Sequence, residues 1–392
     1  MKKRLILSAN AVVRRGGQGI NLHHMIEGLG GMYDLSVFCQ GSGADTSARH
    51  VPESSWSVRI QQIPILRRRR DWINLLTEAN FDRQVSRQLE AADIFQGTTG
   101  QCLESLTVAQ SKGCMTILDV LTLHNEHFHA QMVRESARFG IRPAQHPIMH
   151  KRVLEEYRRA ELIRVMSEPA RQTFLERGFA PEQVFIAAPP FDMGRFPKAE
   201  FRGSRFTVSF VGLLEPAKGF HYLIDAFRAL NRPDAELLLW GGTGARALAR
   251  YFRKQNAACP AIQVRPFNVS EIGPENVYGI SSVLVHPSLA DGFGLVVGEA
   301  MASGIPVITT TATGASQWIV DGVNGYIVPP GDSDAIRDRL EYLMDHPSLL
   351  PEMGRAARET IAQLTMERFR QSYSDAIAGN RKSAGNLERT EA

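Results

Sequence analysis

The sequence predicts an α/β protein made of two similar halves, each a parallel sheet covered by helices. Apolar runs of strand length alternate with helix-like segments along the chain, which is the pattern of βαβ units. The length of 392 residues exceeds what one hydrophobic core usually supports. The alternation also restarts after a stretch rich in proline, glycine and charge at residues 189–204, which is the best candidate for a linker.

Each half is defined by its strands and by helices with one apolar face. The first half has predicted strands at residues 4–8, 35–38, 93–95, 116–119, 162–166 and 184–187. The second half has predicted strands at residues 206–211, 236–240, 262–265, 283–286 and 307–310. Helical spacing joins Leu22, Met25, Ile26 and Leu29 in the first half, and Phe220, Leu223, Ile224 and Phe227 in the second. Near the end of the chain, Phe369, Tyr373 and Ile377 have the same spacing.

The composition excludes several classes of protein. The 45 basic and 41 acidic side chains give a formal net charge of +4, which is too even to indicate a nucleic-acid partner. The four cysteines are scattered, so neither a zinc knuckle nor a disulfide framework is expected. No stretch approaches the roughly 20 apolar residues of a membrane span, and the first residues resemble a strand rather than a signal peptide. We therefore expect a cytoplasmic protein.

One local concentration of charge stands out, the run Arg67, Arg68, Arg69 and Arg70. Such a run is more often a solvated loop than a site. The alternative is a patch that meets anionic lipid, as in peripheral contact with the inner face of a membrane, or an anionic acceptor.

The segment from His286 to Val307 carries the strongest chemical signal. A buried strand leads into a loop with Gly292 and Gly294, and a helix is predicted from near Gly294 to Gly304. The free N–H groups and the dipole of such a helix start favour an anion. Asp291 and Glu299 bracket this start, and carboxylates suit the hydroxyls of a sugar or ribose. The residues alone leave a plain βαβ crossover with solvated acids equally open.

Three further segments are candidates. After the strand at 206–211, Gly212 opens a turn that leads to Lys218, which could neutralise a leaving diphosphate or simply be exposed. After the first strand, Gly16 and Gly17 would let a ligand approach the backbone, although a tight turn explains them as well. After the strand at 116–119, three histidines at positions 124, 127 and 129 lack acidic or cysteine partners at compact spacing, so no metal site is expected.

The segment around Asp291 closely resembles the signature of retaining glycosyltransferase family 4. Two acids separated by seven residues surround Gly292-Phe293-Gly294, and Ala-Met-Ala-Ser-Gly-Ile-Pro-Val follows Glu299. The resemblance implies the GT-B fold, in which two Rossmann-like domains have parallel sheets facing a central cleft. It implies an acceptor domain at residues 1–195, a nucleotide-sugar domain at 196–365, and a last helix at 366–392 that returns to the first domain before a flexible tail.

The resemblance also implies roles for individual residues. Glu299 would bind the ribose of the donor, and Asp291 would contact the transferred sugar. Lys218 would bind the diphosphate, and His124 would contact the donor sugar. The backbone at Gly212, Gly292, Phe293, Gly294 and Leu295, with Gly16 and Gly17 of the first domain, would complete the donor site.

The chain departs from the family pattern at four places. It has Asp291 where the family usually has Glu, Leu213 where an Arg joins the lysine in a diphosphate clamp, and Gln317 where Glu is common. Pro190-Phe191 replaces the usual Asn-Gly ahead of the linker's Asp192. Either another base such as Arg14, Arg15 or Arg265 replaces the missing Arg, or turnover is weak.

The resemblance implies transfer of a sugar from a nucleoside-diphosphate sugar to a hydroxyl of a glycan or lipid-linked glycan, as in polysaccharide biosynthesis. It implies retained anomeric configuration, no bound metal and no cofactor other than the donor substrate. Leu213 and Asp291 keep open a pseudo-transferase that binds nucleotide and acts as a partner subunit. A third reading is another enzyme on the same fold, such as an epimerase or a phosphorylase.

Overall fold

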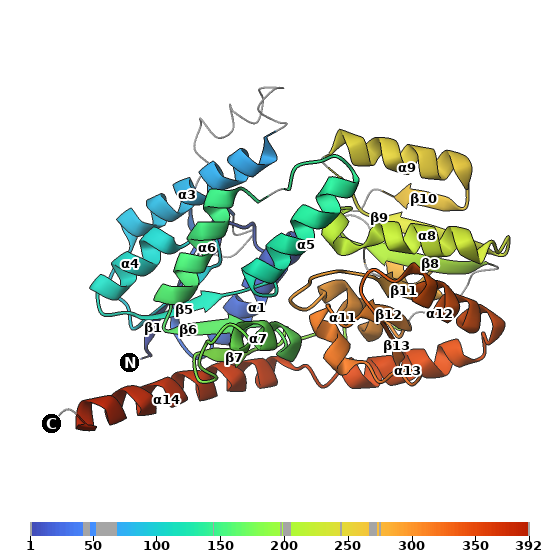
Figure 1. Ribbon diagram of the computed structural model, residues 1–392. Coiled ribbons are helices and arrows are strands. Elements are labelled where there is room, and N and C mark those ends of the chain that lie inside the picture. The colour runs from blue at the N-terminus through green and yellow to red at the C-terminus, as the bar shows by residue number, and fades with distance from the viewer. Residues whose placement is uncertain are drawn as a thin grey trace. The chain divides into compact units, whose positions relative to one another are not determined.

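The chain forms two compact units (Figure 1). The computed structural model describes residues 2–41, 48–51, 69–143, 145–196, 198, 205–243, 245–265, 273 and 276–390. Unit 1 consists of Met1–His129, Arg142–Pro189 and Met366–Ala392, and unit 2 of Ala130–Ile141 and Pro190–Thr365. Part of the expected linker, including Pro197 and residues 203–204, lies outside the described ranges.

Unit 1 is built on a seven-stranded parallel sheet in the order β3-β2-β1-β4-β5-β6-β7. The strands are β1 (Arg4–Ser8), β2 (Asp34–Cys39), β3 (Ala48–His50), β4 (Ile94–Thr98), β5 (Met115–Asp119), β6 (Leu162–Val165) and β7 (Val184–Ile186). In the centre of the sheet, Leu5 of β1 is in register with Leu35 of β2 on one side and Ile94 of β4 on the other. The six strands predicted for this half are confirmed. The edge strand β3 was not predicted, because its three residues are too few to show a period.

Helices cover the sheet of unit 1. They are α1 (Gly16–Leu29), α3 (Arg70–Gln88), α4 (Leu103–Ser111), α6 (Pro147–Arg159), α7 (Glu168–Leu175) and α14 (Met366–Thr390), with the first residues of α5 (Asn125–Arg138). The last helix, α14, packs against α1 and β7 (Figure 1). Its Phe369, Tyr373 and Ile377 are buried in the same core as Leu22 and Met25, as their helical spacing predicted.

Unit 2 is built on a six-stranded parallel sheet in the order β10-β9-β8-β11-β12-β13. The strands are β8 (Phe206–Val211), β9 (Ala235–Trp240), β10 (Ile262–Arg265), β11 (Val283–His286), β12 (Val307–Thr310) and β13 (Gly325–Val328). The helices are α8 (Phe220–Leu230), α9 (Arg246–Ala258), α11 (Leu295–Ala302), α12 (Ser333–Asp345) and α13 (Leu349–Ile361). All five predicted strands are confirmed. The sequence pattern missed β13 because glycine-rich turns flank this short strand.

Unit 2 also contains a segment from the first half of the sequence, Ala130–Ile141. Its Phe139 packs edge-on against Tyr251 with ring centroids 5.2 Å apart, and it joins the core around Phe220. The buried Glu135 carboxylate lies 3.0 Å from Nε2 of His221 on α8. No sequence pattern predicted that Ala130–Ile141 joins unit 2, because a helical pattern does not reveal which core a helix joins.

Both sheets have a switch point, where the strand order reverses direction. It lies between β1 and β4 in unit 1 and between β8 and β11 in unit 2. Open parallel sheets bind ligands beyond the carboxyl ends of the strands at such a point. The loops that follow these four strands are therefore the places to look for a site.

Candidate active site

In unit 2, the loops after β8 and β11 lie against one another. The N–H of Leu289 donates to the carbonyl oxygen of Ala217 at 2.9 Å. Gly219 has a φ of +70°, and a Cβ at this position would overlap the carbonyl oxygen of Pro287. A residue with a side chain would therefore both strain the backbone and separate the loops.

The contact between these loops brings together Lys218, Asp291 and His286. The Lys218 ammonium lies 2.5 Å from Asp291 Oδ2, and Nε2 of His286 lies 2.9 Å from the same oxygen. The other oxygen, Asp291 Oδ1, accepts the N–H of Gly294 at 3.0 Å. The Asp291 side chain is 12% exposed and that of Lys218 is 30% exposed, so both can be reached from solvent. The aspartate thus fixes the lysine and the glycine loop at once.

The charges in this cluster follow from burial and from the partners. Burial alone would raise the pKa of Asp291, but Lys218 and the hydrogen bond from His286 outweigh it and hold that pKa well below its ordinary value. Burial lowers the pKa of His286, so its neutral ring donates the Nε2 proton to Asp291. No role was predicted for His286 from the sequence. The signal available was a polar residue at the carboxyl end of an apolar strand.

Directly after this cluster, helix α11 begins. Gly294 precedes it with a φ of +80°, and a Cβ there would lie 2.8 Å from a methyl carbon of Thr313. The first N–H groups of a helix have no carbonyl one turn earlier, and the helix dipole places positive charge there. The Phe293 side chain between these residues is buried. The predicted helix start near Gly294 is confirmed, as is its end before Gly304, whose φ is +74°.

Glu299 lies one turn into α11. The hydroxyl of the buried Tyr278 donates to Glu299 Oε2 at 2.6 Å. Burial raises the pKa of Glu299, while Tyr278 and the charge of Arg195 oppose that rise. Behind the helix, the ring of Phe191 occupies the space where Gly298 lacks a side chain. No pattern in the sequence indicated Tyr278.

Leu213, which stands where the resembled family has an arginine, is open to solvent. Gly212 has a φ of +141°, and the Leu213 side chain is 62% exposed. Arg265, one of the predicted substitutes, ends β10 and bonds to Gln263 at 2.7 Å. In the sheet, β9 and β8 lie between β10 and the switch point. The strand order therefore does not place Arg265 next to Lys218.

Part of the chain is similar in sequence to known proteins. Residues 195–360 match the family model of glycosyl transferases group 1. The chain is 31% identical to the capsular polysaccharide biosynthesis glycosyltransferase CapM of Staphylococcus aureus over 180 residues, which are 43% of this chain and 46% of CapM. It is 28% identical to the D-inositol 3-phosphate glycosyltransferase of Paenarthrobacter aurescens over 225 residues, 51% of this chain and 54% of that one. The aligned region thus spans about half the length of the curated relatives.

Similarity of fold extends over nearly the whole chain. The crystal structure of Anabaena HepE in complex with UDP-glucose superposes with a TM-score of 0.72 at 16% identity, covering 96% of this chain and 99% of HepE. The chain therefore has the GT-B fold. The group 1 match falls on unit 2, so Lys218, His286, Asp291 and Glu299 all lie inside the matched region, residues 195–360.

Three residues predicted to contact the donor lie in unit 1, outside the matched residues 195–360, and they have two different settings. Gly16 and Gly17 are exposed at the start of α1, and a Cβ on either would meet no atom within 4 Å. His124 is 3% exposed and packs between Tyr157 and Phe174, each with a ring centroid 4.9 Å away. Burial lowers the pKa of His124 to about 4. A donor contact for these three residues stays a prediction.

The switch point of unit 1 holds polar groups that the sequence analysis did not identify. After β1, the Asn10 amide donates to Glu78 Oε2 of α3 at 2.7 Å, and the Asn10 N–H donates to Gln101 Oε1 at 2.7 Å. Below them, the buried Glu156 accepts the N–H groups of Gly100 and Cys102. Burial raises the pKa of Glu78 and of Glu156 to about 7 each. Only Asn10 had a usable signal, its place directly after a strand.

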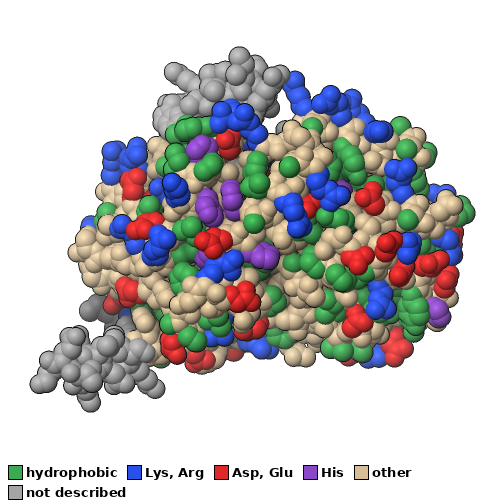
Figure 2. All heavy atoms as spheres, viewed as in Figure 1, with side chains coloured by type: hydrophobic (Ala, Val, Ile, Leu, Met, Phe, Trp, Pro, Cys, Tyr) green, Lys and Arg blue, Asp and Glu red, His purple; other side chains and the backbone are tan. Residues whose placement is uncertain are grey.

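Two further histidines, His129 and His150, stack on each other in unit 1. Figure 2 shows histidine side chains grouped on the face that carries α5 and α6. The rings of His129 and His150 are stacked with centroids 4.6 Å apart, and Nδ1 of His129 lies 2.8 Å from Gln145 Oε1. Within the described ranges, no three His, Cys, Asp or Glu side chains are placed to hold an ion together.

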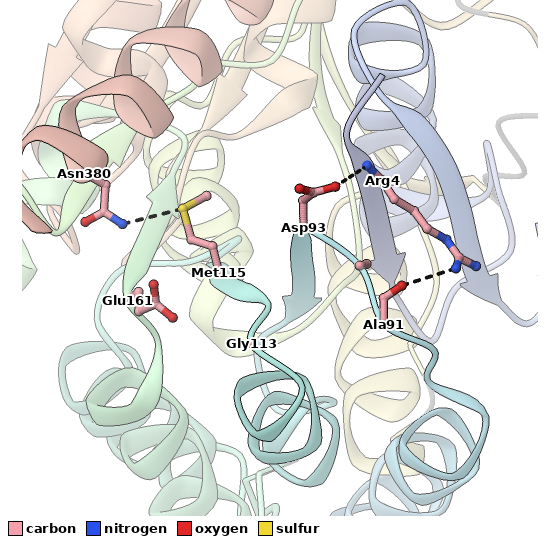
Figure 3. Close-up of a pocket in the computed structure, with 8 residues that line it drawn as sticks. Arg4, Ala91, Asp93, Gly113, Met115, Glu161 and Asn380 are labelled. Carbon is pink, nitrogen blue, oxygen red and sulfur yellow. Dashed lines mark hydrogen bonds between the residues drawn. The ribbon is translucent and has the colours of Figure 1, made fainter. Parts of the chain in front are cut away.

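A hollow of about 590 Å³ lies in unit 1 beside the amino ends of its strands (Figure 3). Arg4, Asp93 and Met115 line it at the amino ends of β1, β4 and β5, together with Glu161 and Asn380. The Arg4 N–H donates to Asp93 Oδ2, and the Asn380 amide faces the Met115 sulfur (Figure 3). Because ligands of such sheets bind at the opposite ends of the strands, we do not regard this hollow as the active site.

The arginine run is only partly described. Arg67 and Arg68 lie outside the described residues. Arg69 pairs with Asp71 at 3.2 Å and lies over the ring of Trp72, and Arg70 begins α3. No helix in the described ranges is long and apolar enough to cross a bilayer.

Proposed function

We propose that this chain is a retaining glycosyltransferase of family 4 that moves a sugar from a nucleoside-diphosphate sugar to a hydroxyl acceptor. The observation that carries the proposal is the grouping of Lys218, Asp291 and the start of α11 at the switch point of unit 2. A cation and free helix N–H groups together suit a diphosphate. The group 1 match over residues 195–360 supports the same conclusion.

In this proposal, the donor is bound by unit 2. The diphosphate lies between Lys218 and the amides of Gly294 and Leu295, and it displaces Asp291 Oδ1 from the Gly294 N–H. The ribose lies against Glu299. Asp291 holds Lys218 in place before the donor arrives, since the two are already 2.5 Å apart. The diphosphate then competes with Asp291 for the ammonium, and the freed carboxylate is available to a hydroxyl of the transferred sugar.

Chemistry would proceed on one face of the sugar. The bond from the anomeric carbon to the phosphate oxygen breaks, the acceptor oxygen bonds to the same carbon, and its proton passes to the departing phosphate. Lys218 and the helix start stabilise the charge that develops on that phosphate. The protein's main contribution is then positioning and electrostatics, with no bound metal and no cofactor besides the donor.

We assign the acceptor to unit 1. Its switch point offers a carboxylate and amides in Glu78, Asn10 and Gln101, and such groups bind hydroxyls well. CapM is named for capsular polysaccharide biosynthesis, which supports a glycan or lipid-linked glycan as acceptor.

Within the proposal, the protein is cytoplasmic, and the run Arg67–Arg70 touches anionic lipid. Flotation with anionic liposomes tests this contact, and no binding even at low salt would end it.

The donor proposal is tested by binding and turnover together. A thermal-shift screen measures the unfolding temperature with UDP, GDP, ADP and their sugars. The nucleotides of one base should raise this temperature, because a ligand that binds the native state stabilises it. The UDP-glucose complex of HepE makes uridine the first choice. With the matching sugar nucleotide and an acceptor such as a simple glycoside, the protein should then release the nucleoside diphosphate as the sugar is transferred. Nucleotide binding without transfer or donor hydrolysis would instead support the pseudo-transferase.

A further inference from the structure

Glu299 is held by a residue from outside its own helix. Tyr278 lies in the segment before β11, and its side chain is 1% exposed. Its hydroxyl donates to Glu299 Oε2 at 2.6 Å, a length typical of a bond to a charged acceptor. The glutamate is therefore fixed in one orientation before any ligand arrives.

The tyrosine itself is held firmly. Its carbonyl oxygen accepts the N–H of Ser281 at 3.0 Å, and the Ser281 hydroxyl donates to the carbonyl oxygen of Val277 at 2.7 Å. Burial raises the pKa of the Tyr278 phenol well above its ordinary value, so the hydroxyl keeps its proton and can only donate to the carboxylate. In this hydrogen bond Tyr278 is therefore always the donor and Glu299 always the acceptor.

The arrangement leaves part of Glu299 for a ligand. A carboxylate offers about four acceptor positions, and Tyr278 occupies one of them on Oε2. Glu299 is only partly buried, whereas Tyr278 is fully buried. A ligand can thus reach the glutamate but not the tyrosine.

We propose that Tyr278 is a positioning residue that orients Glu299 toward the ribose hydroxyls of the donor, and so determines how strongly the site distinguishes a ribonucleotide from its deoxy form. This inference rests on the proposed function. It assigns ribose recognition to a pair of residues rather than to Glu299 alone.

The test is the change Tyr278→Phe, which removes one oxygen and leaves the ring that fills the core. Calorimetry measures the Kd of UDP and of 2′,3′-dideoxyuridine diphosphate for both proteins. We expect Tyr278→Phe to weaken UDP binding about tenfold, the usual effect of losing one hydrogen bond to a charged group. Binding of the dideoxy nucleotide should change less than about twofold, because it has no hydroxyls for Glu299 to bind.

Tyr222→Phe is the matched control. The Tyr222 hydroxyl also donates to a carboxylate in unit 2, Glu135 at 3.3 Å, but Tyr222 lies on α8 rather than beside α11. This variant should bind both nucleotides as the wild type does. In addition, Tyr278→Phe should have no further effect on UDP binding when Glu299→Gln is already present.

Three results would overturn the inference. Equal weakening of both nucleotides would make Tyr278 a general structural residue. Unchanged UDP binding would remove it from recognition, and tighter UDP binding would make it a competitor of the ribose. If the wild type binds none of UDP, GDP and ADP, the proposed function itself fails. If GDP or ADP binds instead of UDP, the same comparison is made with its dideoxy form.

Discussion

At the switch point of unit 2, a lysine and a histidine share one aspartate oxygen, whereas the switch point of unit 1 holds amides and carboxylates. Lys218 and His286 lie 2.5 and 2.9 Å from Asp291 Oδ2. In unit 1, the Asn10 amide lies 2.7 Å from Glu78 Oε2. The two sheets have the same parallel construction and the same reversal of strand order. The loops alone therefore give one unit a cation beside an aspartate and the other unit amides beside a carboxylate.

One ion pair in each unit shows a further difference, in its exposure to solvent. Arg164 and Asp119 of unit 1 are fully buried, and the Arg164 guanidinium also bonds to Asn21 and to the carbonyl oxygen of Ala187. Lys218 and Asp291 of unit 2 remain partly exposed. A pair that is closed to solvent serves the fold, while a pair that a ligand can reach is available for binding.

The largest effect should come from Arg164→Met, because it leaves the charge of Asp119 buried without its partner. We expect unit 1 to lose about 3–5 kcal/mol of its free energy of unfolding. Lys218→Met, which breaks the exposed pair, should cost unit 2 at most about 1 kcal/mol. Hydrogen exchange of peptides from each unit measures both. Equal losses in the two variants would contradict the distinction between the pairs.

Next in size is the effect of Lys218→Ala on catalysis. Removing a group that stabilises transition-state charge typically costs about 2.7–4 kcal/mol of barrier, so kcat should fall about 10²–10³-fold. Lys254→Ala is the control, because Lys254 is an exposed lysine of α9 in the same unit. Initial rates with the donor found by the binding screen give the comparison. An unchanged kcat in Lys218→Ala would remove this lysine from the mechanism.

A smaller effect is expected at two glycines that lie against aromatic rings, Gly298 in unit 2 and Gly28 in unit 1. Gly298→Ala would place a methyl group inside the Phe191 ring, and such overpacking costs about 1–3 kcal/mol. Gly28→Ala in unit 1 would approach Phe369 at 2.7 Å and should cost less, because the overlap is smaller.

Thermal unfolding of both variants tests this order. Gly242→Ala is the control, because its Cβ would meet nothing within 4 Å. Adding Phe191→Leu to Gly298→Ala should restore part of the stability, since the smaller side chain makes room for the methyl group. A Gly298→Ala protein as stable as the control would show that the ring moves aside freely.

The smallest effect concerns pH and the carboxylates of unit 1. Burial raises the pKa of Glu78 from 4.5 to about 7, so the folded state holds a proton that the unfolded chain releases. The stability that this proton contributes is present below pH 4.5 and is lost as the pH rises to about 7. Glu78→Gln should therefore flatten the pH dependence of unit 1 and stabilise it near neutral pH, where the wild-type carboxyl ionises.

Denaturant unfolding at several pH values measures the difference between Glu78→Gln and the wild type. The comparison must be made between variants, because His124 and other histidines with lowered pKa values change stability in the opposite direction. Identical pH dependence in the two proteins would mean that Glu78 is ionised in the folded state.

The sequence by itself determined the two parallel sheets, the helix start at Gly294 and the buried face of α14. These features depend on local period and on turn residues, both of which can be read along the chain. It also identified Lys218, Asp291 and Glu299 as candidates, because each follows a recognisable strand, turn or helix start. Their roles remain predictions.

Only the tertiary structure decided which groups meet. The order of strands places the loops after β8 and β11 side by side, and this brings His286 and Lys218 to one oxygen of Asp291. It likewise sets Tyr278 against Glu299 and gives Ala130–Ile141 to unit 2. None of these follows from a local pattern, because each joins residues whose distance in space is fixed by the packing of the whole unit.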